Sequence, residues 1–335
     1  MTAKQDEAQD DLLGKIAWLY YKERMRQEDI GHALGLSRTK IQRMLERANR
    51  STIVQVEIRH PRYNLLSVEA QLTGAYQLTD AVVVPAVANS DVVAIAAIAK
   101  AGAAYLSRTV QGGGWDVLGI GWGSTTSQLA EEFAPANTSC VTTVVSLLGT
   151  LSTSTSGHPS VPAETIAKKI GSNFYHIWAP AIAQSAEGAS AFLAEPRINE
   201  VIRLARTCKL SVISIGAFSA QSPLVRMGYL SERDVSRLRK KGAVGDLACG
   251  FFTRDGTFIE DSVDARIVGV GKAILEPQNR AKSRLRVIGL GGGVGKFEAV
   301  KAALTGRKVD VLVTDEVTAT KLLEEKKRSG VFHGS

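Results

Sequence analysis

Residues 27–46 have the sequence QEDIGHALGLSRTKIQRMLE, two short amphipathic segments joined through Gly35. Glycine adopts the positive φ angle that ends a helix and turns the chain. Gly31 is small where the two helices would cross, and Ser37 can cap the second helix. Apolar residues recur at helical spacing and would pack the helices together; they are Ile30, Leu34, Leu36, Ile41 and Met44. The pattern predicts a helix-turn-helix.

The flanking segments extend this module. A helix over residues 12–21 would complete a small core through Leu13, Ile16, Ala17 and either Leu19 or Tyr20. Residues 51–58 are β-branched and nearly alternating, which predicts a strand and therefore a winged helix-turn-helix. The His60-Pro61 pair then interrupts the chain. We expect one domain over residues 1–60 and a second over residues 61–335.

The second helix of the motif has the side chains expected of a DNA-recognition helix. Residues 38–50 hold five basic side chains and one acid. Arginine and glutamine make bidentate contacts with base edges, and basic residues near them bind phosphates. The alternative is a basic amphipathic helix without a DNA partner. The residues expected to contact DNA are Gln27, Ser37, Arg38, Thr39, Lys40, Gln42, Arg43 and Arg47. So small a domain needs symmetric assembly to bind tightly.

After residue 63, short apolar runs alternate with helical stretches. The expected strands are 81–84, 117–120, 141–148, 212–215, 286–290 and 309–313. The expected helices are 92–106, 124–133, 161–170, 197–206, 232–240, 296–304 and 318–327. This alternation predicts an α/β domain with a mainly parallel sheet. Ligands of such folds bind where the strands end.

Bulk composition excludes several classes of protein. The net charge is +8, which is compatible with DNA binding without proving it. Cys140, Cys208 and Cys249 lie far apart, so we expect buried reduced thiols rather than disulfides or a metal site. No run of about 18 consecutive apolar residues and no signal peptide is found, which indicates a cytoplasmic protein without a membrane partner. No cofactor motif is present.

Three glycine-containing loops are candidate binding segments. Residues 119–126, GIGWGSTT, pass from a strand end into a helix, where backbone N–H groups and hydroxyls suit an anion. Residues 241–252 place Asp246 between glycines, as a hydroxyl acceptor or a turn carboxylate. Residues 289–296, GLGGGVGK, match neither a Walker A loop nor a GxGxxG motif. Lys296, beside exposed loop N–H groups, still suits a phosphate or a carbonyl.

Together these segments resemble the SorC family of sugar-binding transcriptional regulators over nearly the whole chain. The resemblance depends on IAWLYY (16–21), GLSR (35–38), GWGST (121–125), GAVGD (242–246), Gly291-Gly292 with Lys296, and VTDE (313–316) with Thr318 and Ala319. IGAF (215–218) and GYLS (228–231) look especially similar to the autoinducer-2 regulator branch. Ser124 differs from the arginine or threonine of some members.

The resemblance implies a sensor with the fold of sugar-phosphate isomerases and deaminases. It implies a homotetramer, or at least a homodimer, whose affinity for operator DNA changes when a phosphorylated sugar or sugar alcohol binds. We expect a repressor of a carbohydrate operon that its effector releases, although the sequence leaves activation open. The implied effector site comprises Gly121, Trp122, Gly123, Ser124, Thr125, Asp246, Leu247, Ala248 and Lys296. Lys296 would contact a phosphate or a carbonyl, and covalent capture of an aldehyde stays open.

Two other functions fit parts of the sequence. A sugar-phosphate-converting enzyme would need an acid and a base, for which Asp246, Lys296 or the Asp315-Glu316 pair could serve, with His158 and His176 as weaker candidates. We expect no catalytic residues. A general nucleic-acid-binding protein fits poorly, because most of the chain would then have no purpose.

Overall fold

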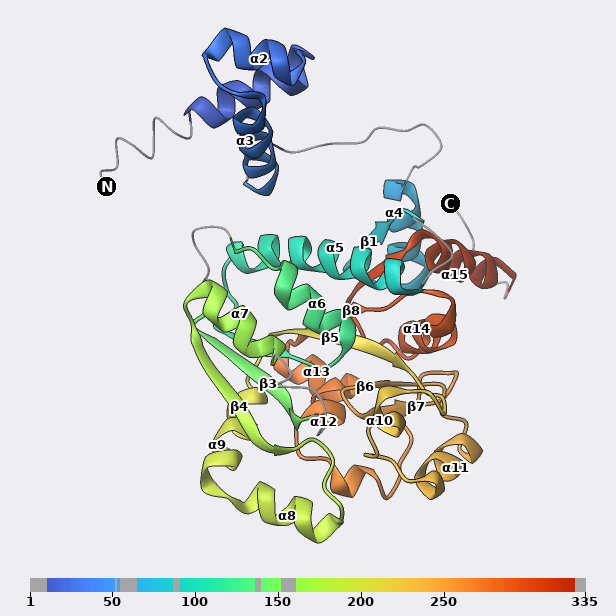
Figure 1. The fold of residues 1–335 in the computed structure, drawn as a ribbon. Coiled ribbons are helices and arrows are strands. Elements are labelled where there is room, and N and C mark those ends of the chain that lie inside the picture. The colour runs from blue at the N-terminus through green and yellow to red at the C-terminus, as the bar shows by residue number, and fades with distance from the viewer. Residues whose placement is uncertain are drawn as a thin grey trace. The chain divides into compact units, whose positions relative to one another are not determined.

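The computed structural model describes residues 11–51, 53–54, 65–86, 91–135, 140–151 and 161–328. The chain divides into two compact units, Met1–Tyr63 and Asn64–Ser335, and each is described by itself. Figure 1 shows a small helical unit and a larger α/β unit. The mixed α/β class expected from the sequence is confirmed.

The N-terminal unit is a bundle of short helices. Residues 11–17 are α-helical and continue as a π-helical turn, η1 (Trp18–Lys22). The helix-turn-helix follows as α2 (Gln27–Leu34) and α3 (Arg38–Arg50). The fully buried residues Ile16, Ile30 and Ile41 form its core, with the partly buried Leu34, Leu36 and Met44 against them. The predicted core is confirmed; Leu45 and Ala48 are buried in addition.

The turn has the geometry that its residues predict. Gly35 lies in the left-handed region at φ 63° and ψ 31°, and ends α2. The Ser37 side chain accepts a hydrogen bond from the Lys40 N–H at 3.3 Å, which confirms the predicted cap. A Cβ on Gly31 would lie 2.6 Å from the Leu36 carbonyl oxygen, so the turn packs directly on this glycine.

Replacing Gly31 with alanine is therefore expected to destabilise the N-terminal unit by about 1–3 kcal/mol, the usual effect of an extra carbon in a packed site. Hydrogen exchange of the α2 and α3 amides in the full chain measures this change. Gly14→Ala is a matched control, because nothing lies within 4 Å of a Cβ on this helical glycine. That control should stabilise its helix slightly. Unchanged protection of α2 in Gly31→Ala would contradict the prediction.

The predicted wing lies mostly outside the described residues. Ser51, Ile53 and Val54 are described and belong to no strand. Residues 52 and 55–58 are not described, so the strand expected over 51–58 stays a prediction. The Ser/Thr tract 152–156 and His158 also lie outside the described residues.

The C-terminal unit contains a parallel sheet in the order β1-β9-β8-β5-β2-β3-β4. Its strands are β1 (Asp80–Val84), β2 (Val117–Ile120), β3 (Thr143–Thr150), β4 (Asn173–Pro180), β5 (Leu210–Ala217), β8 (Arg286–Leu290) and β9 (Val311–Asp315). All six predicted strands are present. The antiparallel hairpin β6 (Gly245–Leu247) and β7 (Gly250–Phe252) attaches to the end of β5.

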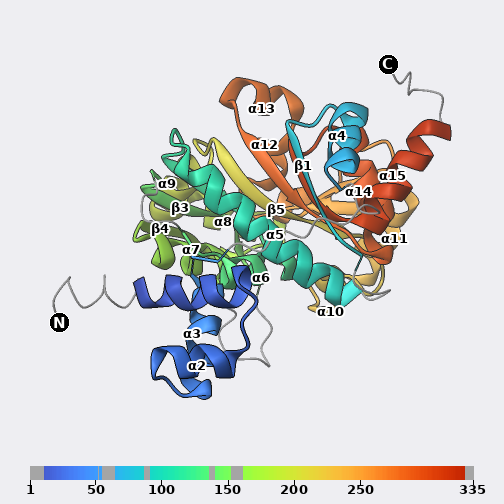
Figure 2. The same cartoon turned by 90° about the horizontal axis from the view of Figure 1, so that it is seen from above.

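Helices cover both faces of this sheet (Figures 1 and 2). One face packs against α5 (Asp91–Gln111), α6 (Ser124–Glu132) and α7 (Pro162–Ile170). The other packs against α4 (Leu65–Tyr76), α9 (Pro196–Ala205), α12 (Gly271–Leu275), α14 (Phe297–Thr305) and α15 (Glu316–Arg328), together with the β6–β7 hairpin. The remaining helices are α8 (Ala186–Ala194), α10 (Pro223–Arg226), α11 (Glu232–Lys240), α13 (Pro277–Ser283), η2 (Asp264–Arg266) and η3 (Val294–Lys296).

The sequence pattern did not predict β4, the hairpin or five of the α-helices, α4, α8, α10, α12 and α13. β4 has the sequence NFYHIWAP, whose central histidine interrupts the apolar run. Each hairpin strand is only three residues long. Cys140 is exposed, so the expectation that all three thiols are buried was wrong for this residue.

α5 is long and apolar enough to cross a membrane by length and composition alone. In the structure, one side of it is buried against the sheet through Ile98, Ala99 and Leu106. A Cβ on Gly102 would lie 2.9 Å from Leu290 of β8, so the helix packs closely at this point. This packing is that of a core helix in an α/β domain.

Candidate functional site

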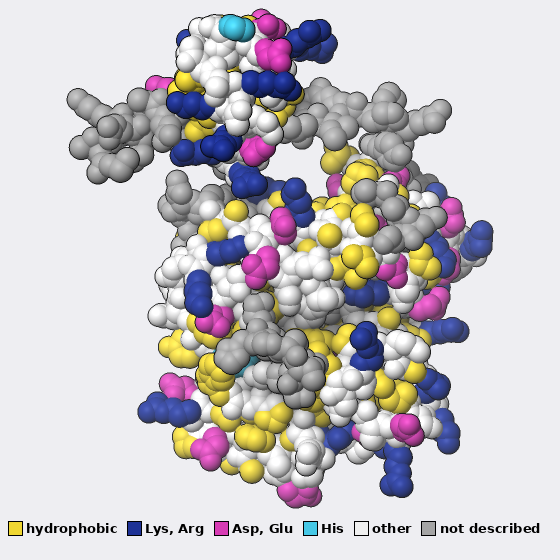
Figure 3. Space-filling model, in the orientation of Figure 1, with side chains coloured by type: hydrophobic (Ala, Val, Ile, Leu, Met, Phe, Trp, Pro, Cys, Tyr) yellow, Lys and Arg dark blue, Asp and Glu magenta, His cyan; other side chains and the backbone are white. Residues whose placement is uncertain are grey.

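The helix α3 presents its basic side chains to solvent. Of the eight residues predicted to contact DNA, Gln27 is half-buried and the other seven are exposed. The Arg38 guanidinium donates to Glu28 at 3.1 Å, and the Gln42 amide donates to Glu46 at 3.2 Å. Figure 3 shows basic side chains on the visible face of this unit. The helix-turn-helix thus offers the donors that phosphate and base contacts require.

The order of the parallel sheet reverses between β2 and β5. The chain continues from β2 outward to β3 and β4, whereas β5 is followed by β8 and β9 on the other side. Ligands of open parallel sheets bind outside the carboxyl ends of the strands at such a point. Gly121 of the predicted binding segment directly follows β2 there, and its N–H donates to the Val212 carbonyl at 2.8 Å.

This loop lies tightly against β5. Gly123 has φ +143°, and a Cβ on it would lie 2.6 Å from the Ser214 side chain, so the position requires glycine. The Thr126 N–H donates to the Ser214 hydroxyl at 3.0 Å. Ser124, the first residue of α6, is exposed, and the buried Thr125 hydroxyl has no hydrogen-bond partner among the described residues. The start of α6 therefore has groups available for an anion.

Asp246 lies on the same face of β5 as Ser214. It pairs with Gly216, two residues after Ser214, and a Cβ on Gly216 would lie 2.1 Å from Asp246 Oδ1. The Cys249 N–H donates to Asp246 Oδ2 at 3.4 Å. Burial raises the pKa of Asp246 to about 6, although the Cys249 N–H and the Lys296 charge act in the opposite direction.

Lys296 follows β8, and its charge interacts with that of Asp246. Burial lowers the pKa of Lys296, while the negative charges of Asp246 and Asp91 raise it. The expectation that exposed loop N–H groups adjoin this lysine was wrong. The Gly293 N–H donates to Asp315 Oδ2 at 2.7 Å, and the next two N–H groups of the loop donate to Asp91.

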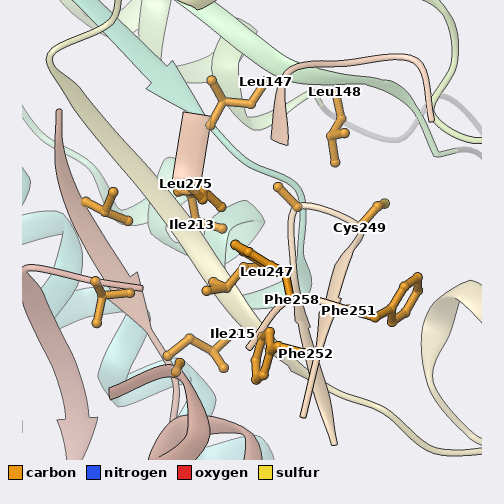
Figure 4. Close-up of a cluster of buried hydrophobic side chains, with 14 of the residues drawn as sticks. Leu147, Leu148, Ile213, Ile215, Leu247, Cys249, Phe251, Phe252, Phe258 and Leu275 are labelled. Carbon is orange, nitrogen blue, oxygen red and sulfur yellow. The ribbon is translucent and has the colours of Figure 1, made fainter. Parts of the chain in front are cut away.

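The turn of the β6–β7 hairpin lies directly beside Asp246. Leu247 is fully buried in the apolar cluster of Figure 4, and Ala248 is almost as buried. Ala248 and Cys249 have φ angles of 47° and 63°. Such angles are strained for residues that carry a Cβ, and strain of this kind gathers at functional sites. It places the Cys249 N–H within reach of the Asp246 carboxylate.

A cavity of about 70 Å³ adjoins this site at the ends of β2, β3 and β4, with Trp122 and His176 in its lining. The His176 ring is 2.8 Å from the Ser146 hydroxyl through Nδ1 and 2.9 Å from the Thr150 hydroxyl through Nε2. Burial lowers the pKa of His176, so its ring is neutral at pH 7. Both ring nitrogens of His176 are hydrogen-bonded to these hydroxyls, as in a buried structural histidine. Among the described residues no cluster of His, Cys, Asp and Glu could hold a metal ion.

Comparison with known proteins identifies the family. The model of the family described as "Putative sugar-binding domain" matches residues 60–324, most of the chain. The chain belongs to the SorC family of sugar-binding transcriptional regulators. It is a sugar-responsive transcriptional regulator.

Relatives of this SorC-family regulator match it over almost their whole length. The erythritol catabolism regulatory protein EryD of Brucella abortus is 29% identical over 95% of this chain and 98% of its own. The transcriptional regulator LsrR of Klebsiella pneumoniae is 29% identical over 94% of each chain. The full-length sorbitol operon regulator SorC of Klebsiella pneumoniae has the same fold, with a TM-score of 0.73 at 23% identity over 93% of this chain and 98% of its own.

Three site residues of this SorC-family regulator could not be predicted from its sequence. Ser214 and Gly216 lie on a buried strand, where nothing in a linear pattern separates them from ordinary core residues. Asp91 directly precedes the helix predicted over residues 92–106, and nothing in the sequence marked it as a site residue. Strand pairing and loop packing bring these three residues to the predicted loops, and no sequence spacing signals that.

Proposed function

We propose that this regulator is a repressor of a carbohydrate or sugar-alcohol operon, and that a phosphorylated sugar or related small molecule releases it from operator DNA. One observation supports the effector site: the start of α6 and Asp246 lie over the same face of β5, at Ser214 and Gly216, where the sheet order reverses. An anion site and a hydroxyl acceptor are what a sugar phosphate needs.

The proposed orientation follows from the donors and acceptors. The phosphate binds at the start of α6, where Ser124 and Thr125 offer hydroxyls and the N–H groups of the first turn are positive. Asp246 accepts hydrogen bonds from sugar hydroxyls, over a floor made by Leu247 and Ala248. Lys296 contacts the carbonyl or hydroxyl end, and Trp122 lines the side next to the cavity.

The DNA-binding role falls to α3. Arg38, Thr39, Gln42 and Arg43 contact base edges in the major groove, and Ser37, Lys40 and Arg47 contact phosphates, as does Gln27 at the start of α2. We propose a homodimer or homotetramer that spans two half-sites, acting in the cytoplasm. Catalysis is not part of the proposal. Asp315 accepts hydrogen bonds from the Thr318 and Gly293 N–H groups, and Glu316 accepts one from the Ala86 N–H, which gives both carboxylates a structural role.

Linkage between the two sites tests this function. Sugar phosphates that stabilise the protein in a thermal-shift panel should lower its operator affinity in fluorescence anisotropy. Operator DNA should lower their affinity by the same factor, because allosteric coupling is reciprocal. The coupling typically amounts to about 5- to 150-fold. Operator that leaves effector affinity unchanged, or turnover of a sugar phosphate, would refute the proposal.

A further inference from the structure

The loop before α14 binds a carboxylate of the protein itself. Asp91, the first residue of α5, accepts from the Val294 N–H at 2.9 Å through Oδ1 and from the Gly295 N–H at 3.3 Å through Oδ2. Asp91 is exposed, unlike Asp315, which is buried and binds the preceding N–H of the same loop. We call the Val294 and Gly295 N–H groups the loop cradle.

The loop fits closely around this carboxylate. Gly293 has φ +86°, and a Cβ on it would lie 2.6 Å from Asp91 Oδ1. A Cβ on Gly295 would lie 3.0 Å from Asp91 Oδ2. Larger residues at either glycine would therefore displace the carboxylate. This contact joins α5 to a loop that is about 200 residues away in the chain.

Two further groups that suit an anion belong to this loop or lie beside it. Lys296 follows it directly, and its charge interacts with that of Asp91. The Thr314 hydroxyl is fully buried, has no hydrogen-bond partner among the described residues, and lies 3.1 Å from the position of a Cβ on Gly292. Adjacent backbone N–H groups with a lysine beside them are typical of a phosphate site. In this structure the Asp91 carboxylate occupies the two N–H groups.

We propose that Asp91 is a specificity residue of the effector site, which excludes effectors that carry a second phosphate at the Lys296 end. This inference rests on the proposed function, because it assumes that the first phosphate binds at the start of α6. To bind there, a second phosphate would have to displace Asp91 from two charge-assisted hydrogen bonds. If Asp91 stayed in place, the phosphate would lie beside a like charge, and this repulsion would lower the affinity for bisphosphates. The effector is thus a monophosphate whose other end is a hydroxyl or a carbonyl.

Full-length Asp91→Ala and Asp91→Asn test the proposal by isothermal titration with fructose 6-phosphate, fructose 1,6-bisphosphate and inorganic phosphate. The wild type should prefer the monophosphate. Both variants should bind the bisphosphate and inorganic phosphate about 10- to 100-fold more tightly than the wild type, which corresponds to the contribution of hydrogen bonds to a charged group. Affinity for the monophosphate should change less than threefold.

Glu187→Ala is the matched control, because it removes an exposed carboxylate from the first turn of another helix, α8. Asp91→Asn retains a helix-starting polar side chain if the alanine variant folds poorly, and Asp91→Glu should keep the selectivity of the wild type. The proposal would be overturned if the folded variants bound the bisphosphate and inorganic phosphate no more tightly than the wild type does.

The titrations distinguish this failure from a failure of the proposed function. If no sugar phosphate binds the wild type or the variants, the site on α6 is refuted. In that case the titration with inorganic phosphate still tests the role of Asp91. Tighter binding of inorganic phosphate to Asp91→Ala than to the wild type would support the proposal that Asp91 occupies the loop cradle, and equal binding would refute it.

Discussion

Replacing Arg43 with alanine is expected to lower affinity for the operator by about 5- to 150-fold, the contribution of a bidentate arginine–base contact. Arg43 is exposed in the N-terminal half of α3, the part of a recognition helix that contacts base edges in helix-turn-helix proteins. Affinity for unrelated duplex DNA should fall much less. Fluorescence anisotropy with an operator selected from random duplexes, and with unrelated duplex DNA, measures the two affinities. The ratio of these affinities is then compared between the variant and the wild type.

Arg47→Ala is the matched comparison, because it removes the same charge one turn further along α3. Arg47 should contact a phosphate, so its loss should weaken binding to all DNA about equally. The slope of log affinity against log salt should also fall by about one unit. Equal specificity ratios in both variants would contradict base recognition by Arg43 and would favour a basic helix without sequence preference.

Replacing Asp246 with asparagine is expected to weaken effector binding by about 10- to 100-fold, because hydrogen bonds to a charged acceptor are lost. The same change should stabilise the effector domain at pH 7. Burial raises the pKa of Asp246 to about 6, above the ordinary value of 3.8, so the folded domain disfavours the ionised carboxylate. A shift of this size corresponds to at most about 3 kcal/mol. Effector binding should weaken while the melting temperature of the domain rises.

The pH dependence follows from the sign of this shift. The contribution of Asp246 to stability is fully present below pH 4 and is lost as the pH rises through 6. Effector affinity should run the opposite way and fall below pH 6, because only the carboxylate accepts two hydroxyl hydrogens. Titration calorimetry and thermal melts between pH 4 and pH 8 would show both trends. Asp246→Asn should remove the stability trend and leave only the change in affinity that follows the phosphate's own second pKa of about 6.

Asp255→Asn is the control for charge. Asp255 is an exposed turn carboxylate whose pKa is lowered by hydrogen bonds from the Thr253 hydroxyl and the Thr257 N–H. Its replacement should leave effector binding unchanged and should destabilise the domain slightly at pH 7. If Asp246→Asn behaves in the same way, Asp246 is a turn carboxylate and the proposed site is wrong.

Most of the features that could be predicted from the sequence depend on interactions between residues that are close together in the chain. Gly35, Ser37 and the spacing of Ile30 and Ile41 specify the helix-turn-helix, because positive φ, capping and helical periodicity act within a few residues. The α/β class followed from alternating apolar runs for the same reason. The short glycine-containing loops after β2 and β8 were visible because glycine marks close backbone approach.

Tertiary structure alone decided how these loops meet and which of their groups are free. The order of the strands placed the loop after β2 beside Ser214, and the β6–β7 hairpin laid Asp246 over Gly216; neither pairing has a local signal. The loop N–H groups beside Lys296 were expected to be exposed and so open to a ligand, yet Asp91 and Asp315 accept hydrogen bonds from them. Hydrogen bonds between distant segments depend on the packed fold, so a linear sequence shows the donors but cannot show which acceptors reach them.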